Sequence, residues 1–407
     1  MSKDRVIDSL GRIDDDMIQN VESLRQKKKR PAWTKWAAMV ACLCLVVGGV
    51  FVFRQNDTPI PPDYPQLPML SITDDTGAAM GFEGYMAYDI SDLTNGNPWH
   101  EDAELATLPV YRNALSYDSN FIVTGADWSQ MENMLYDVAA KLGIPREDLV
   151  VSDNAPDESE QAIIKEKFES VGDKVPDGYF EPTQLIGEAN GIIITVSQTL
   201  TATIDFVPPV ELPEEYNFAD YCSYEDMLSA SKYLQEQYAP LLGMTQPKPN
   251  IYSGDYDIYQ RRLFNLTFFE SNGTLAEQMV NYAFRGVAFY SNENGQLWLA
   301  RVWEPDLSDK VGDYPIVSVE DAKDLLSDGH YITTVPYELP GMEYVKKVEL
   351  LYRNGAHDEY HIPYYRFLVE LPKEERDNGI KTYGAYYVPA VHESYITNMP
   401  IWDGSFN

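Results

Sequence analysis

An uninterrupted apolar segment near the N-terminus constrains the fold more than any other feature of this sequence. Residues 36–53 read WAAMVACLCLVVGGVFVF, eighteen residues without a charge, bounded by Lys35 and Arg54. A helix of this length rises roughly 27 Å, close to the thickness of the hydrocarbon layer of a membrane. A buried core helix usually keeps a polar face, which this segment lacks. The segment therefore predicts one transmembrane helix.

The charges around this segment predict its orientation. A basic cluster precedes it, and the positive-inside rule places such clusters in the cytoplasm. Because 35 residues precede the apolar run, an uncleaved signal-anchor fits better than a cleaved signal peptide. We therefore expect residues 1–35 inside and the rest of the chain outside. The expected membrane-flanking residues are Lys27, Lys28, Lys29, Arg30, Lys35 and Arg54.

The formal net charge of -33 is unevenly distributed along the chain. Residues 1–35 carry nine Lys and Arg against six Asp and Glu, which leaves 22 against 58 in the remainder. Nucleic-acid affinity comes mainly from basic patches that release counterions, so a part this acidic argues against direct nucleic-acid binding. Beyond the apolar segment Cys222 is the only cysteine, so no disulfide can form within the outer part. A large outer part without disulfides fits a bacterial surface.

A stripe of apolar residues recurs at every third or fourth position before the apolar segment, as on one face of an amphipathic helix. The stripe consists of Val6, Leu10, Ile13, Met17, Val21 and Leu24. A helix this short cannot form a domain alone, so the stripe predicts a face that binds a cytoplasmic protein or lies on the inner leaflet. The alternative is a weakly structured tail whose basic end only fixes the orientation.

The strings DSLGRIDDDMI and KKKRPAWTKWAAMVACLCLVV resemble the N-terminus of membrane-anchored anti-sigma-factor-like proteins of Gram-positive bacteria. The resemblance covers about the first 53 residues. Zinc-binding members of that group carry a cluster of His and Cys in the cytoplasmic part, whereas residues 1–35 contain neither residue type. The resemblance implies the plasma membrane of a Gram-positive-type bacterium, with the N-terminus in the cytoplasm and the C-terminal domain outside.

Helix and strand signals beyond the apolar segment predict the α+β fold class. We expect one transmembrane helix followed by tandem extracytoplasmic modules, each a helix packed on an antiparallel sheet. Residues 54–69 contain five prolines and predict an extended spacer. The expected modules span residues 70–210, 211–312 and 313–407.

Each expected module contains a helix that has a capping residue, an apolar stripe and a terminal glycine. These helices run from Asp127 to Gly143, from Ser223 to Gly243 and from Ser318 to Gly329. Alternation of apolar and polar residues follows each helix, most clearly from Ile192 to Phe206, and predicts half-buried antiparallel strands. The dipeptide Asn294-Gly295 predicts the turn of a hairpin.

Three segments near the C-terminus, SVEDAKDLL, HIPYYRFLVELP and TYGAYYVPAV, are similar to the extracytoplasmic domains of YycH- and YycI-type regulators and to PepSY-like modules. This resemblance covers about the last 90 residues. It implies a helix packed on an antiparallel sheet and a regulatory, protein-binding role without a cofactor or catalytic residues.

Candidate catalytic and metal-binding patterns fail on their spacing. His357 and His361 have the separation of a zinc-protease pair, but that motif needs a helix and a glutamate directly after the first histidine. The flanking residues predict a hairpin instead, in which the histidines lie roughly 13 Å apart. Cys222 has no histidine nearby in sequence, and Asp255 and Asp257 lack the rest of a calcium loop. We therefore expect no catalytic residue, no cofactor and no metal ion.

A group of tyrosines near the C-terminus has two interpretations, a binding face or cross-strand packing in the core. It comprises Tyr364, Tyr365, Tyr383, Tyr386 and Tyr387.

Taken together, these features predict a non-enzymatic sensor or regulator. Its large acidic outer domain would bind an envelope protein or peptide, and the N-terminal helix would contact a cytoplasmic protein. One alternative is a cell-wall-associated enzyme or accessory, which requires a pocket with two inward carboxylates roughly 5–10 Å apart. The other alternative is a passive envelope scaffold.

Overall fold

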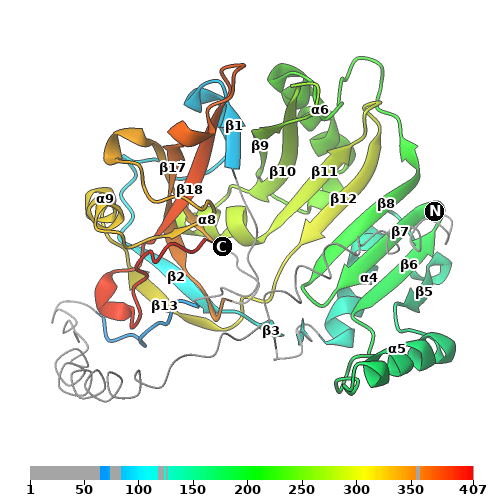
Figure 1. Cartoon of the computed structure of the whole chain (residues 1–407). Coiled ribbons are helices and arrows are strands. Elements are labelled where there is room, and N and C mark those ends of the chain that lie inside the picture. Colours follow the sequence, from blue (N-terminus) through cyan, green and yellow to red (C-terminus); the bar gives the residue numbers. More distant parts are fainter. Residues whose placement is uncertain (1–64, 74–83, 118–122, 125–126, 354–357, 407) are drawn as a thin grey trace. The chain divides into compact units, whose positions relative to one another are not determined.

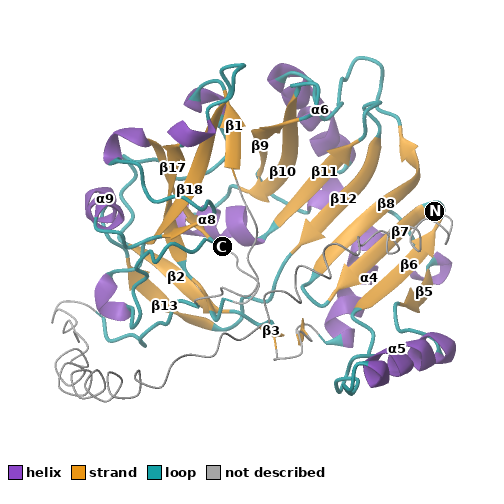
Figure 2. Ribbon diagram, viewed as in Figure 1, coloured by secondary structure: helices purple, strands orange, loops and turns teal. Residues whose placement is uncertain are grey.

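Antiparallel strands are the main regular elements of the described structure, with short helices on their faces (Figure 2). The computed structural model describes residues 65–73, 84–117, 123–124, 127–353 and 358–406. All of them belong to one unit, residues 60–407. The combination of helices with antiparallel sheets confirms the predicted α+β character.

The larger of the two main sheets has eight strands in the order β5-β6-β7-β8-β12-β11-β10-β9 (Figure 1). Every neighbouring pair is antiparallel. Two hairpin series, β5 to β8 and β9 to β12, join where β12 pairs with β8. The strands are β5 (Val150–Asp153), β6 (Gln184–Ala189), β7 (Ile192–Ser197), β8 (Thr201–Val210), β9 (Pro247–Tyr256), β10 (Arg262–Glu270), β11 (Gly286–Ser291) and β12 (Leu297–Trp303).

The strand predicted from Ile192 to Phe206 is a hairpin of β7 and β8. Ile194 pairs with Ile204, and the alternating residues Ile194, Val196, Ala202, Ile204 and Phe206 are buried. Residues facing each other across an antiparallel pair lie on the same face, so the hairpin preserves the alternation that one long strand would show. The turn at residues 198–200 contains neither glycine nor proline, which is why the sequence pattern gave no sign of it.

A second sheet has the order β1-β18-β17-β15, and β14 pairs with β18 beside β1. Two smaller sheets accompany it in the order β13-β2-β16 and as the pair β3-β4. These strands are β1 (Gly84–Ala87), β2 (Thr107–Arg112), β3 (Ser116–Tyr117), β4 (Val123–Thr124), β13 (Lys310–Pro315), β14 (Ile332–Thr333), β15 (Val345–Tyr352), β16 (Tyr360–His361), β17 (Pro363–Glu370) and β18 (Lys381–Pro389).

All three predicted helix starts carry a complete capping box, at Asp127, Ser223 and Ser318. The helix predicted from Ser223 to Gly243 breaks at Tyr238, because Pro240 has no N–H with which to continue the backbone hydrogen bonds. The helices are α4 (Trp128–Lys141), α5 (Glu158–Ser170), α6 (Tyr224–Gln237), α7 (Ala239–Leu242), α8 (Leu275–Phe284) and α9 (Val319–Ser327). Short 3-10 turns are η1 (Ile90–Asp92), η2 (Arg146–Asp148), η3 (Met342–Tyr344), η4 (Pro372–Glu374) and η5 (Glu393–Tyr395).

Helices cover one face of the eight-stranded sheet. α4 packs on β6 and β7, and α6 packs on β9 and β10. Their buried side chains form one cluster with the inward residues of the strands, including Leu135, Leu234, Ile204 and Phe268. The face of β8 to β12 opposite α4 and α6 carries polar and aromatic side chains, and α8 packs on it at β10 and β11.

The second sheet is buried on both faces. Along β17, Phe367 and Val369 belong to the cluster under α8 and α9, whereas Leu368 belongs to a cluster on the other side. The five C-terminal tyrosines are all buried in these two clusters, which supports the packing interpretation. A strand buried on both faces has a nearly continuous apolar sequence, and β17 follows this pattern except at Arg366 and the terminal Glu370.

The described end of the predicted spacer packs on the folded unit. Leu70 bridges to Ile396, and the carbonyl groups of Pro65 and Pro68 accept hydrogen bonds from the hydroxyls of Tyr395 and Tyr314. Residues 65–69 are therefore fastened to this unit rather than held away from it.

The structure does not support the predicted transmembrane helix. Within the described ranges, no helix is long and apolar enough to cross a membrane. α4 and α6, with 14 residues each, would rise roughly 21 Å against a hydrocarbon layer of roughly 30 Å. Residues 36–53 lie outside the described residues. The predictions of a single-pass topology, a plasma-membrane location and a cytoplasmic N-terminus are corrected accordingly.

The tandem arrangement in the predicted fold class is also corrected. Strands from the ranges 70–210 and 211–312 share the eight-stranded sheet, and β1 and β2 pair with strands of the range 313–407. Helix-plus-strand repetition along the chain does not specify which strands pair, because pairing depends on contacts between distant residues. The sheets therefore cross the predicted boundaries.

Leu135→Ala should lower the free energy of unfolding by about 2–5 kcal/mol, because Leu135 is fully buried between α4 and the sheet. The matched control is Ile163→Ala on α5, whose side chain is largely exposed, with an expected change within about 0.5 kcal/mol. Urea denaturation followed by circular dichroism measures both. Equal losses in the two variants would contradict the assigned core.

Candidate functional site

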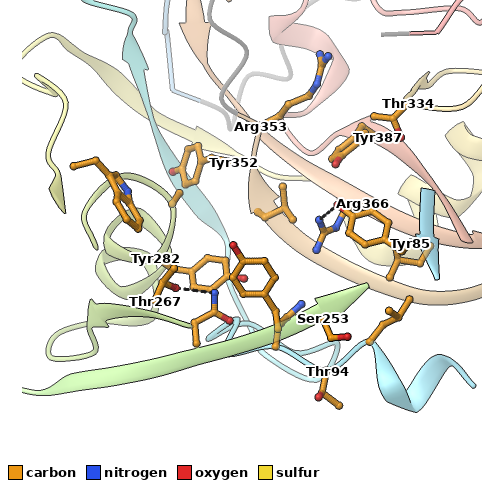
Figure 3. Close-up of a pocket in the computed structure, with 18 of the residues that line it drawn as sticks. Tyr85, Thr94, Ser253, Thr267, Tyr282, Thr334, Tyr352, Arg353, Arg366 and Tyr387 are labelled. Carbon is orange, nitrogen blue, oxygen red and sulfur yellow. Dashed lines mark hydrogen bonds between the residues drawn. The ribbon is translucent and has the colours of Figure 1, made fainter. Parts of the chain in front are cut away.

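A cavity of about 630 Å³ lies between the second sheet and the face of the eight-stranded sheet opposite α4 and α6. This volume is within the range of roughly 300–1,000 Å³ that is typical of small-molecule sites. One wall consists of residues from β8 to β12, and the other consists of residues from β15, β17 and β18. α8 and the segment after β1 complete the lining (Figure 3).

The first wall is built by cross-strand neighbours on the polar face of the sheet. Asn250 on β9 pairs with Thr267 on β10, and its amide donates a hydrogen bond to the Thr267 hydroxyl at 3.1 Å. Thr267 pairs in turn with Ala288, and Ala288 with Arg301 on β12. Because side chains alternate between faces, this row faces the cavity while the next residues on each strand face the helices. The apolar residues of these strands therefore face the helices, and the residues between them form the polar part of the cavity wall.

Trp303 supplies a large aromatic surface at the end of the same wall. It pairs with Gly286 on β11 and Thr201 on β8. A Cβ atom at Gly286 would lie 2.4 Å from Cζ2 of the indole, so the ring lies directly over this glycine. Any larger residue at position 286 would displace the ring from the cavity wall.

The second wall contains a buried ion cluster. Glu349 on β15 accepts hydrogen bonds from Nε and Nη2 of Arg366 on β17, at 2.9 and 2.5 Å. Nζ of Lys347 lies 2.8 Å from the other carboxylate oxygen, which also accepts a hydrogen bond from Asn95 at 2.6 Å. The third nitrogen of the guanidinium, Nη1, donates a hydrogen bond to the hydroxyl of Tyr85 at 3.1 Å (Figure 3).

These contacts set the pKa values of Glu349 and Arg366. Burial alone would raise the pKa of Glu349, but Arg366 and Lys347 lower it to about 2. Burial opposes the charge on Arg366, yet the adjacent Glu349 carboxylate raises the pKa of that guanidinium further. Two cations and one anion therefore leave one net positive charge beside the cavity.

The segment after β1 holds the two walls together. Asn95 binds Glu349 of the second sheet, and the next residue, Gly96, donates its N–H to Asn250 Oδ1 of the large sheet at 2.6 Å. A Cβ atom at Gly96 would lie 2.9 Å from the Asn250 Cα, so only glycine permits this approach. Arg262 of β10 adds a hydrogen bond to the Asp92 carbonyl at 2.7 Å. The width of the cavity is thus set by hydrogen bonds from one segment to both walls.

The charge of the cavity is opposite to that of the protein. The chain has 64 Asp and Glu against 31 Lys and Arg, yet no described residue that lines this cavity is acidic. The lining contains Arg301, Arg353 and Arg366. Arg301 lies 5.7 Å from the ring centre of Tyr290, and Arg353 lies 5.8 Å from that of Tyr387, distances that allow attraction between cation and ring.

The remaining titratable groups of the lining are tyrosines. Burial raises the pKa values of Tyr252, Tyr282 and Tyr352 above the ordinary value of 10. The hydroxyls of these three tyrosines therefore stay neutral at physiological pH.

The predicted N-terminal sites cannot be placed in the structure. The membrane-flanking residues, Lys27 to Arg30, Lys35 and Arg54, and the apolar face from Val6 to Leu24 lie outside the described residues. They remain predictions.

His361 is buried in a hydrophobic setting. It lies on β16 opposite Tyr111, and its ring centre is 5.0 Å from that of Phe284. Its Nδ1 atom has no hydrogen-bond partner among the described residues, and burial lowers the pKa of the ring to about 4. His357 lies outside the described ranges, and within them no group of His, Cys, Asp and Glu could hold a metal ion.

Two further candidates have structural roles. Burial raises the pKa of the Cys222 thiol to about 12, so this cysteine is a core residue without nucleophilic character. Asp257 accepts hydrogen bonds from the backbone of Tyr259 and Arg261 and from the Arg261 side chain, all within the turn between β9 and β10. Its carboxylate shapes that turn.

No pattern in the sequence singled out the cavity residues, although a weak signal was present. Arg301, Arg353 and Arg366 are single basic residues in or directly after strands that are otherwise apolar and aromatic, in the strings LARVW, LLYRN and YYRFL. In an acidic chain, a single arginine among aromatic residues of a strand is a candidate ligand group. Which arginines meet is decided only by the pairing of the sheets.

Comparisons with known proteins give little guidance. No family model and no curated protein match this chain. Among solved structures, the chain is similar to an uncharacterised protein from Eubacterium rectale ATCC 33656, with a TM-score of 0.28 and 10% sequence identity. The similarity covers 70% of this chain and 84% of that chain. A TM-score this low supports no argument, and the two sequence resemblances stay predictions.

Glu349→Gln should destabilise the fold by about 3 kcal/mol at pH 7, because Arg366 and Lys347 would lose the carboxylate that compensates their charge. The pKa of Glu349 is about 2 when folded and 4.5 in its ordinary state, so the stabilisation is complete above pH 4.5 and is lost as the pH falls towards 2. Urea denaturation across this range should show a steeper loss for the wild type than for Glu349→Gln. Glu132→Gln, which affects an exposed ion pair with Arg146, is the control. Parallel pH profiles for wild type and Glu349→Gln would refute the assignment.

His361 should produce a separate pH dependence at higher pH. Its folded pKa of about 4 lies below the ordinary value of 6.5, so the unfolded chain binds the proton more readily. Stability should fall by up to about 3 kcal/mol as the pH decreases from 6.5 to 4. His361→Gln should flatten the profile in this window, whereas His100→Gln, at an exposed position, should leave it unchanged. An unaltered slope in His361→Gln would show that the ring is not protected from protons.

Proposed function

We propose that this protein is a non-enzymatic ligand-binding protein, with a sensor or regulator role, and that the cavity between the two sheets is its binding site. The observation that carries the proposal is the lining itself. It combines aromatic rings, amides, hydroxyls and arginines around a volume suited to a small ligand.

The protonation states of the lining favour binding over catalysis. General acid–base chemistry needs a group whose pKa lies near the working pH. Among the described lining residues the titratable groups are tyrosines and arginines, and burial moves the pKa of Tyr252 and Tyr282 further from neutrality. A hydrolytic site with two inward carboxylates would need acidic residues, and no described residue of this lining is acidic.

The rigidity of the walls is consistent with a preformed site. Asn250 is held by Gly96, and Arg366 is held by Glu349 and Tyr85. A ligand entering such a site does not have to order the side chains that contact it, which preserves affinity. The predicted envelope protein or peptide ligand stays a prediction, and a small ligand fits this cavity directly.

Thr94→Trp tests whether the cavity holds a ligand. Thr94 lines the cavity, is exposed and makes no side-chain hydrogen bond within the described part, so an indole there should obstruct the site without disturbing the core. Native mass spectrometry of the full chain, purified from its own host, should reveal a bound small molecule in the wild type and none in Thr94→Trp. His100→Trp adds the same ring at an exposed position outside the lining and should keep the ligand.

Two outcomes would overturn this proposal. Equal occupancy in Thr94→Trp and the wild type would place the ligand elsewhere. If the released ligand, returned to fresh protein, were converted to a product of different mass, the protein would be an enzyme.

A further inference from the structure

The cavity contains hydrogen-bond donors that lack acceptors. The guanidinium groups of Arg301 and Arg353 and the hydroxyls of Tyr252 and Tyr290 line it. In the described part of the chain, none of these four groups has a side-chain hydrogen bond or an ion pair. Arginine can only donate, so these groups require a ligand or water that supplies acceptors.

The missing acceptors indicate an anionic ligand. Carboxylate and phosphate groups match the planar fork of arginine and accept two hydrogen bonds from it. A cationic ligand would meet three arginines without an acidic residue among the described lining. The acidic remainder of the protein repels anions at long range, so an anion would be favoured only where the local field is positive.

The other lining groups point to a sugar. Trp303 and the tyrosines offer flat apolar surfaces, while Asn95, Thr201 and Ser253 offer small polar groups between them. A sugar ring has apolar C–H faces and hydroxyls around its edge, and it matches both kinds of surface at once. A lipid tail would need a continuous apolar channel, whereas polar side chains interrupt this lining throughout.

The geometry argues against an extended peptide. Peptides that add to a sheet pair with the free edge of a strand. Here the cavity wall is a sheet face, formed by β8 to β12. β9, the strand at the end of the sheet, packs against β1, and its Asn250 side chain accepts a hydrogen bond from Gly96.

We infer that the cavity binds an acidic oligosaccharide, a short sugar chain that carries carboxylate or phosphate groups, through Arg301 and Arg353. This inference rests on the proposed function, because it names the ligand class of the same site. Arg301 on β12 and Arg353 after β15 belong to opposite walls, so an acidic sugar chain that spans the cavity reaches both. Trp303 provides the stacking surface next to Arg301.

The test is binding of the full chain to an array that carries hexuronate-containing and phosphate-containing oligosaccharides beside their neutral counterparts. We expect retention of acidic members only. Isothermal titration with the best member should show binding that weakens as salt increases. Arg301→Ala and Arg353→Ala should each weaken it roughly 10- to 100-fold, the loss expected for a charged hydrogen bond. The control, Arg146→Ala, removes the same charge outside the cavity and should bind like the wild type.

The outcomes separate this inference from the proposed function. Equal retention of neutral sugars, or full affinity in both cavity variants, would overturn the inference and leave a ligand site in place. Retention of no acidic oligosaccharide, while the host-purified protein still carries a ligand that Thr94→Trp excludes, would also overturn it and leave the proposed function standing. The absence of that ligand as well would overturn both. Circular dichroism of each variant would verify that it is folded.

Discussion

The buried ion pair between Glu349 and Arg366 is the interaction on which the described architecture depends. Removing these charges from water is costly, and the cost is offset only because every charge finds a partner within hydrogen-bond distance. Lys347 and Asn95 occupy the second oxygen of Glu349. Since Asn95 belongs to the segment that also binds Asn250, a charge pair inside one sheet positions the wall of another.

The same cluster contributes to the positive charge of the cavity lining. A carboxylate at Glu349 that faced the cavity would repel anions, but its oxygens are occupied by Arg366, Lys347 and Asn95, and it does not belong to the lining. Arg366 in turn presents Nη1 to Tyr85 on the cavity side. The protein thus combines a strongly acidic composition with a cavity whose described lining contains three arginines and no acidic residue, because the carboxylate that compensates Arg366 lies behind the wall.

Local features could be predicted from the sequence. The capping boxes at Asp127, Ser223 and Ser318 involve residues three positions apart, so neighbouring residues specify them completely. The alternation of apolar and polar residues in β7 and β8 could also be recognised in the sequence, because burial of one face of the sheet requires it. The break at Tyr238 and the turn before Thr201 were not anticipated, since a good apolar stripe continues across both.

What the sequence alone determined is therefore the helices that begin at Asp127, Ser223 and Ser318, the apolar faces that they bury, and the excess of negative charge. The tertiary structure decided which strands pair, and with that the cavity. Arg301, Arg353 and Tyr252 come from three strands or strand ends about 50 residues apart in the chain, and alternation records only the side on which a residue lies. The partner of a strand is selected by packing of the complete unit, as the pairing of β1 with β18 shows.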